Sequence, residues 1–129
     1  MRNRGVIAAL IALQNKIAYG AVQNSSGAFV RASVDAVTAA AAAVAGSMPA
    51  DFRVSITNPP GKDAYPIASF TWLLFYENPT DKAQAKVMVD FMKWALGDGQ
   101  KFAKELGYAP LPPPIIAMEL KALQKIKIQ

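Results

Sequence analysis

The side chains that could carry out chemistry are few in this sequence, and most of them stand alone. The chain has no Cys and no His, which excludes disulfides, thiol redox chemistry, zinc catalysis and Ser-His-Asp hydrolysis. Asp35 stands at a predicted helix start, and the other carboxylates are dispersed without a spacing that pairs them. They are Asp51, Asp63, Glu77, Asp81, Asp90, Asp98, Glu105 and Glu119. We therefore predict no catalytic residue, no metal site and no cofactor, and expect that the chain is not an enzyme.

Three loops contain residues that could carry a function: the first two could bind an anion, and the third could take part in catalysis. The turn Ser25-Ser26-Gly27 offers several donors, residues 97–101 contain two glycines and a lysine, and Lys62-Asp63 lies in a loop after a predicted strand. Phosphate loops need glycine-rich backbone at a helix start, but neither G-x-G-x-x-G nor G-x-x-x-x-G-K-[ST] occurs. We therefore favour structural interpretations: a hairpin turn, a break between two short helices and an ordinary loop.

Composition and charge narrow the class of protein. The 129 residues suit one domain, and a hydrophobic content of 53% is too high for a disordered chain. The net charge of +5 could attract anions, nucleic acid or membrane surfaces. The cations are spread out, however, and only Lys121, Lys125 and Lys127 are close in sequence. This pattern favours a solvated basic surface, so we predict no nucleic-acid partner.

The amino terminus admits two interpretations. Arg2 and Arg4 precede the aliphatic residues 6–13, an order that is typical of a secretory signal. The run is too short to span a bilayer, and Ala18-Tyr19-Gly20 is a poor cleavage site. We favour a buried strand or a short core helix, between which periodicity does not decide.

Hydrophobic patterning predicts an α/β fold. Ser33 is a good N-cap for a helix through Val44 that ends before Gly46. Residues 52–57 alternate between apolar and polar side chains, as in a half-buried strand. Residues 67–76 are aromatic and branched without strict alternation, which predicts a strand covered on both faces. We interpret Trp72 and Trp94 as core residues.

Three further helices are predicted in the second half. One begins with Thr80 as N-cap and ends at Gly97, a short one ends at Gly107, and the last begins at Pro113 or Pro114. Each should bury one apolar face. These faces are Met88, Phe91, Met92, Ala95 and Leu96 in the first, Phe102 and Leu106 in the second, and Ile116, Leu120 and Leu123 in the last.

Several motifs in this order resemble a known family. They are residues 57–67 (TNPPGKDAYPI) with the predicted strand through Tyr76, 89–96 (VDFMKWAL), 99–101 (GQK) and 106–112 (LGYAPLP). Together they are similar to the phosphate-binding proteins, the receptors of high-affinity phosphate ABC importers. The resemblance runs from about Gly5 to Lys127, nearly the whole chain.

The resemblance implies a fold, a function and a location. The family's receptors are two-lobed clamps of α/β lobes, and this chain resembles only their carboxyl-terminal part. It implies a partial two-lobed periplasmic-binding-protein fold, with mixed sheet strands flanked by helices. Residues 1–63 would be a segment of the distal lobe including a crossover strand, and residues 64–129 would return to the first lobe. In the complete protein, periplasmic or extracellular, the implied partners are inorganic phosphate and an ABC permease.

The family's phosphate-binding residues are not matched here. They include an Arg shortly before a Ser-Gly-Thr helix start, whereas Ser26-Gly27 is followed by Ala28 and preceded by Val22. Residues 5–11 also replace a strand that is rich in tyrosine in the family with aliphatic side chains. The phosphate-binding residues are therefore unknown, and we expect the chain alone not to bind phosphate. The alternative is a structural or assembly module that self-associates through exposed strand edges.

Overall fold

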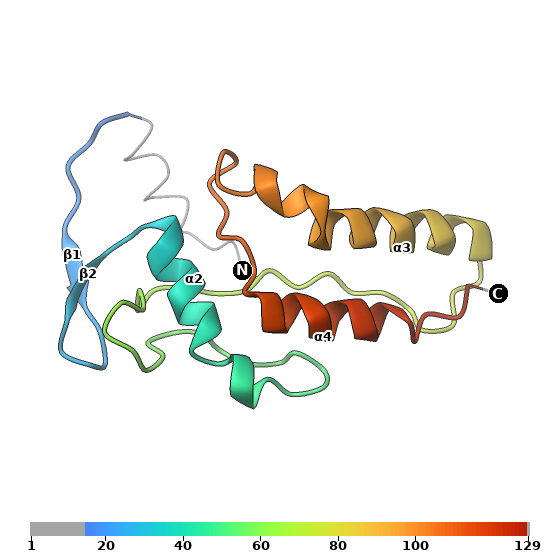
Figure 1. Ribbon diagram of the computed structural model, residues 1–129, viewed down its shortest axis with the longest axis horizontal. Helices are drawn as coiled ribbons and strands as arrows, with labels where there is room; N and C mark the ends of the chain where they lie inside the picture. The colour runs from blue at the N-terminus through green and yellow to red at the C-terminus, as the bar shows by residue number, and fades with distance from the viewer. Residues whose placement is uncertain (1–14, 129) are drawn as a thin grey trace.

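The chain folds as a mixed α/β structure of elongated shape (Figure 1). The computed structural model describes residues 15–128, so the prediction for residues 6–13 lies outside the described part. In chain order the elements are β1 (Ala21–Gln23), β2 (Phe29–Arg31), α2 (Val34–Ala42), η1 (Ala45–Ser47), α3 (Lys82–Leu96), η2 (Asp98–Phe102) and α4 (Pro113–Leu123). The predicted α/β class is confirmed, and no helix within residues 15–128 is long and apolar enough to cross a membrane.

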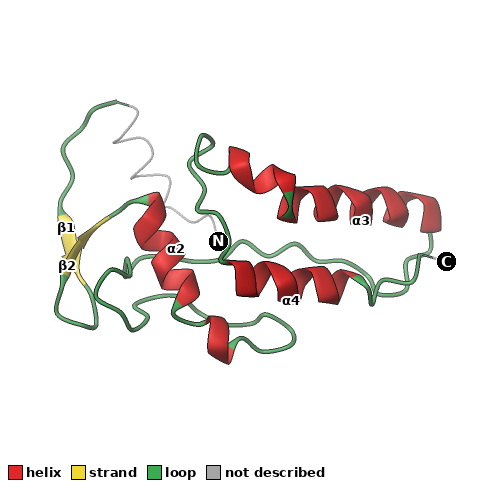
Figure 2. Cartoon of the chain, in the orientation of Figure 1, coloured by secondary structure: helices red, strands yellow, loops and turns green. Residues whose placement is uncertain are grey.

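Two groups of elements make up the molecule. The hairpin of β1 and β2 packs with α2 at one end (Figure 2). At the other end α3 and α4 lie side by side, with an extended segment of residues 69–77 running along them (Figure 1). A backbone hydrogen bond of 2.8 Å from Lys127 to the Glu77 carbonyl joins the end of the chain to the entrance of this helix pair.

The hairpin and α2 follow the sequence closely. β1 and β2 are antiparallel with Val22 opposite Val30, and Gly27 occupies the left-handed region at φ 78°. Ser33 caps α2, because its hydroxyl accepts a hydrogen bond from the Ala36 N–H at 3.1 Å. The helix ends at Ala42, earlier than predicted, and Val44 is buried just beyond it.

The core beside α2 is built from small side chains. Ala40, Val44, Ile56, Ala64 and Ala68 form one buried cluster, in which Ile56 is 1% exposed. Because alanines on α2 have little bulk, the following loop approaches the helix closely. The Tyr65 N–H donates to the carbonyl of Ala36 within α2, at 3.0 Å. Loop and helix are thereby joined at the backbone.

The prediction of a strand at residues 52–57 is wrong, although the predicted pattern of burial is correct. Phe52, Val54 and Ile56 face inward while Arg53 and Ser55 are exposed, as alternation predicts. No strand within residues 15–128 pairs with this segment, so it is extended chain without a ladder. Alternation specifies which face is buried, but a strand also needs a neighbour to accept its backbone hydrogen bonds.

The prediction of a covered strand at residues 67–76 is also wrong. The segment has no ladder, and most of its apolar side chains are exposed rather than buried: Leu74 is 94% exposed and Tyr76 is 85% exposed, whereas Ala68 belongs to the core beside α2. Trp72 and Trp94 are each 48% exposed, so their interpretation as core residues is wrong as well. Aromatic and branched residues favour burial, and within the described residues nothing covers them here.

Helix α3 begins one residue later than predicted. Asp81, rather than Thr80, is its N-cap, and its carboxylate accepts from the Gln84 N–H at 2.9 Å. The helix ends before Gly97 as predicted. Its buried residues are Val89 and Leu96, whereas Met88 and Phe91 of the predicted inner face are exposed. The helix therefore presents a large part of its apolar surface to solvent.

The last helix is correct in position, whereas the short helix predicted to end at Gly107 ends at Phe102, and both are partly wrong in orientation. η2 is a short 3-10 helix, and Phe102 and Leu106 are exposed instead of turned inward. α4 begins at Pro113 as predicted, and Leu123 is buried. Its most buried residue is Ile115, at 1% exposed, whereas the predicted Leu120 is at the surface.

Candidate functional site

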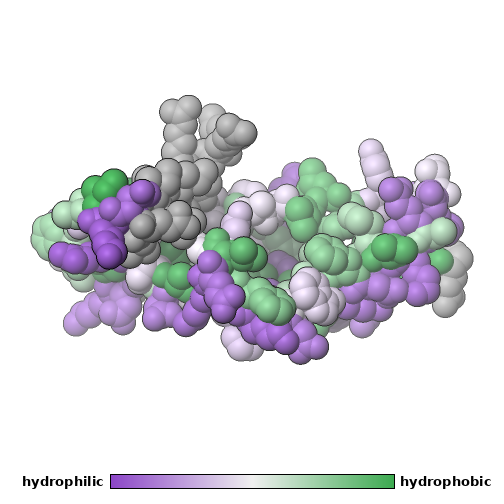
Figure 3. All heavy atoms as spheres, turned by 90° about the horizontal axis from the view of Figure 1, so that it is seen from above, coloured by the Kyte–Doolittle hydropathy of each residue, from purple (hydrophilic) through white to green (hydrophobic). Residues whose placement is uncertain are grey.

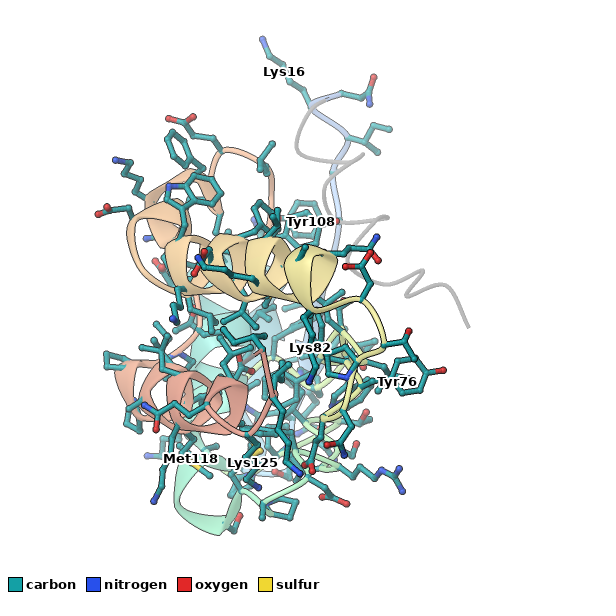
Figure 4. The ribbon with its side chains drawn as sticks, turned by 90° about the vertical axis from the view of Figure 1, so that its right-hand side faces the viewer. Lys16, Tyr76, Lys82, Tyr108, Met118 and Lys125 are labelled. Atoms are coloured by element: carbon teal, nitrogen blue, oxygen red, sulfur yellow. The ribbon has the colours of Figure 1, made fainter. Side chains whose placement is uncertain are left out.

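An open groove lies beside the extended segment of residues 69–77. It has a volume of about 1020 Å³ and is lined by that segment, by α3, by α4 and by the connector at residues 108–111. Figure 4 looks along the two helices and shows Tyr76 projecting away from them, at the open side. Much of the lining is apolar, including Met92 on α3 and Ile115 on α4. A groove of this kind suits an apolar polypeptide better than an inorganic anion.

Several polar groups of the groove are already engaged with the protein. The Trp72 indole N–H donates to the Phe52 carbonyl at 3.0 Å, and the Ser69 hydroxyl donates to the Phe70 carbonyl at 3.1 Å. The Gln100 amide donates to the Ala95 carbonyl at 2.8 Å and accepts from the Leu111 N–H at 2.9 Å. These donors hold α3, the connector and the extended segment in place, and they do not converge on one point.

The charges around the groove are mixed in sign. Asp51, Glu77 and Glu119 line it together with Arg53 and Lys125. Burial raises the pKa of the half-buried Glu119 carboxyl, because the charged form loses hydration beside the apolar lining. Three carboxylates disfavour the entry of an anion, so the groove has the wrong electrostatics for phosphate.

The hairpin turn is a polar junction with the loop at residues 58–63. Asn24 is 5% exposed, and its side-chain amide reaches three carbonyls of that loop. These are Gly61 at 3.0 Å, Lys62 at 2.9 Å and Ala64 at 3.1 Å. Its side-chain oxygen accepts from the N–H groups of Ser26 and Ala28 at 3.0 and 3.1 Å. Asn24 thereby joins two segments about forty residues apart.

Two residues of the turn Ser25-Ser26-Gly27 take part in the same junction. The Ser25 N–H donates to the Asn58 side-chain oxygen at 2.8 Å, and its hydroxyl donates to the Pro59 carbonyl at 2.9 Å. The Gly61 N–H donates to the Ser26 hydroxyl at 3.2 Å. The interpretation of this turn as a hairpin turn is confirmed, and its donors hold the neighbouring loop.

The other two candidate loops are also structural. Lys62 and Asp63 are exposed, and Lys62 enters the junction only through its carbonyl. Residues 97–101 break the helical path as predicted. A Cβ at Gly99 would lie 3.0 Å from the Trp94 carbonyl, so the close turn there leaves little room for a side chain. Among residues 15–128, no group of three or more acidic side chains is placed to hold a metal ion.

A surface cluster of aromatic side chains lies on α3 and η2. The rings of Phe91 and Trp94 are 5.7 Å apart, and those of Trp94 and Phe102 are 6.2 Å apart. Lys101 places its ammonium 5.2 Å from the Phe102 ring centre. Figure 3, which looks onto α3, shows hydrophobic side chains gathered over this half of the molecule. The helix pair thus carries apolar surface outside the groove as well.

Known proteins with similar sequences agree with the motifs. Phosphate-binding protein PstS of Xylella fastidiosa (strain 9a5c) is 41% identical over 112 residues, which cover 87% of this chain and 31% of that protein. The chain is thus similar to one part of a phosphate-binding protein. Phosphate-binding protein PstS of Methanocaldococcus jannaschii is 35% identical over 90% of this chain, and that of Pasteurella multocida is 31% identical over 97%. No protein-family model matches the chain.

The resemblance to the phosphate-binding protein family, predicted from the motifs, is confirmed by these similarities. The chain spans about a third of the length of these relatives. The fold agrees, since the described part is α/β, with a hairpin and helices as in part of a periplasmic-binding-protein fold. Asn24 is the structural residue that the motifs did not single out, although it stands directly before the predicted turn.

Proposed function

We propose that this chain is the carboxyl-terminal portion of a phosphate-binding receptor that serves ABC-type phosphate import. The supporting observation is its similarity, over 87% of its length, to part of a phosphate-binding protein about three times as long. In this proposal residues 1–63 contribute to the distal lobe, and residues 64–129 return to the first lobe. The complete protein is periplasmic or extracellular, delivers inorganic phosphate to an ABC permease and is not an enzyme.

On its own, the chain is proposed not to hold phosphate. A selective phosphate site needs several converging donors and an acceptor for the phosphate proton. At the hairpin turn, the Ser25 N–H donates to Asn58 and the Ser26 hydroxyl accepts from Gly61. In the groove, the Gln100 side chain donates to α3 and accepts from the connector. The groove also carries three carboxylates. The groups that bind the anion therefore belong to the remaining two-thirds of the receptor.

Calorimetry tests the proposal that the chain alone does not bind phosphate. Titration of this chain with inorganic phosphate should give no heat of micromolar binding, with sulfate as the matched anion and the Xylella fastidiosa relative as the positive control. Phosphate-selective binding in the micromolar range by this chain alone would contradict it.

A chimeric protein tests the proposal that the chain is the carboxyl-terminal portion of a phosphate-binding receptor. This chain replaces the 31% of the Xylella fastidiosa relative to which it is similar. If the chain is the corresponding part of a receptor, the chimera should fold and retain phosphate binding within about tenfold of the parent. A chimera that folds, as judged by circular dichroism and a cooperative thermal transition, and binds no phosphate would refute the proposal.

A second candidate function is a self-associating structural or assembly module derived from such a receptor. The observation that favours it is the extended segment of residues 69–77, which leaves apolar side chains such as Leu74 and Tyr76 in solvent. Extended apolar chain without a neighbour recruits other strands. Light scattering of the purified chain at several concentrations tests this function, and a clean monomer throughout would exclude it.

A further inference from the structure

The backbone of the extended segment is free to pair with another strand. In the part of the chain that the structure describes, none of the N–H groups of residues 70–76 donates a hydrogen bond to the protein. The segment is drawn out beside α3 and α4 (Figure 1), and Tyr76 points away from both helices (Figure 4). An extended segment with free N–H groups and apolar side chains has the properties of an unprotected sheet edge.

The exposed area of the chain is large enough for a stable interface. The whole chain exposes 8988 Å², whereas a compact monomer of its mass exposes roughly 6,600 Å². A standard protein interface removes about 800 Å² from each partner. The exposed area in excess of that of a compact monomer is therefore larger than the area that one copy of the chain needs to bury in a dimer.

The segment is complementary to itself when two copies run antiparallel. Residues 70–76 are FTWLLFY, without a charge, and Leu73 is their midpoint. With Leu73 opposite Leu73 of the second copy, Trp72 comes opposite Leu74, and Phe70 comes opposite Tyr76. These pairs lie on one face of the two-stranded ribbon, because residues two apart share a face. A two-fold axis through Leu73 makes the contact isologous and closed.

We propose that two copies of this chain pair through residues 70–76 as antiparallel strands centred on Leu73. The pairing rests on the second proposed function and names its partner and its register. The uncharged segment excludes a strongly acidic or basic partner, and a second copy is the strand present at equal concentration in any solution of the chain. The groove alongside is lined by residues 71–75 and gives the second copy's side chains room to pack.

Substitution of Leu74 tests the pairing, because this side chain is 94% exposed and its replacement leaves the fold of one copy intact. Leu74→Lys places two lysines in the dimer, each beside an apolar ring, and should raise the dimer dissociation constant about 100-fold in sedimentation equilibrium. The matched control is Val87→Lys on α3, which is also exposed and does not line the groove beside the segment. It should change the constant less than threefold.

Single cysteines test the register, since the natural chain has none. Residues directly opposite in an antiparallel pair have Cα atoms about 4.5–5.5 Å apart, within disulfide range. Leu73→Cys should therefore form a disulfide-linked dimer on mild oxidation. Thr71→Cys and Leu74→Cys should cross-link at least tenfold more slowly, because each lies off the two-fold axis.

Each outcome decides the proposal. A dimer that Leu74→Lys weakens and Leu73→Cys traps supports it. A wild-type chain that stays monomeric to about 100 μM, well above the usual dissociation constants of stable dimers, overturns it. So does a dimer that Leu74→Lys leaves intact, and faster cross-linking at Thr71 or Leu74 overturns the register. None of these results bears on phosphate binding, so failure here is distinct from failure of the receptor proposal.

Discussion

Asn24→Ala is the substitution that best tests the structure. The Asn24 side chain makes five hydrogen bonds, three as donor and two as acceptor, and joins the hairpin to the loop at residues 58–63. Only the contact with the Ala64 carbonyl is fully buried, so the other partners regain water. With about 0.5–1.5 kcal/mol for each bond and about 1–3 kcal/mol for an unpaired buried carbonyl, we expect a loss of about 3 kcal/mol.

Urea unfolding followed by circular dichroism measures this loss. For an m-value of about 2 kcal/mol/M, the midpoint should fall by about 1.5 M while the slope stays unchanged. All variants are compared at one protein concentration, because association shifts apparent stability. Asn78→Ala is the matched control, since Asn78 is exposed, and its midpoint should stay within about 0.3 M of wild type.

Asn24→Asp separates the donor from the acceptor. The aspartate keeps the oxygen that accepts from Ser26 and Ala28, but at neutral pH it loses the N–H groups and faces carbonyl oxygens. We expect it to be at least as unstable as Asn24→Ala at pH 7. A loss below about 0.5 kcal/mol in both variants would refute the reasoning, because the junction would then not depend on this amide.

Three further substitutions give independent tests. Burial raises the pKa of Glu119 from its usual 4.5, so wild-type stability falls as the pH rises through the folded-state pKa of this carboxyl. Glu119→Gln should therefore melt at a higher temperature than wild type at pH 7 and at the same temperature at pH 4. An unchanged melting temperature at pH 7 would be inconsistent with burial. Ile115→Ala should lose about 2–4 kcal/mol in urea unfolding, since Ile115 is almost fully buried; a loss under 1 kcal/mol would mean that α4 does not pack as described. Gly99→Ala should lose about 1–2 kcal/mol in the same assay, because its Cβ would lie 3.0 Å from the Trp94 carbonyl; a neutral effect would show that the turn yields easily.

Local signals in the sequence were sufficient where an element depends on its own residues. The N-cap at Ser33, the hairpin turn ending at Gly27 and the helix start at Pro113 are each decided within a few residues, and the structure confirms them. The shift from Thr80 to Asp81 arises because both residue types cap helices and stand next to each other. Such signals locate helices and turns well.

Signals that depend on distant neighbours were not sufficient. The alternation at residues 52–57 predicts which side chains face inward, but whether a strand forms depends on a partner that alternation does not contain. Trp72 has a core-like side chain, yet nothing within the described residues covers it. Asn24 was not identified because its three donor contacts lie 37, 38 and 40 residues away in sequence. The site and its junction are therefore products of tertiary structure.

The bond between Lys127 and Glu77 has a consequence for how the helical half moves. Because it brings the two ends of residues 77–127 together, that stretch forms a loop closed at its base. Lys82 Nζ donates to the Lys127 carbonyl at the same base, and the Thr38 hydroxyl on α2 donates to the Pro110 carbonyl. The helical half is therefore secured at several points, and it does not open through the rupture of a single bond.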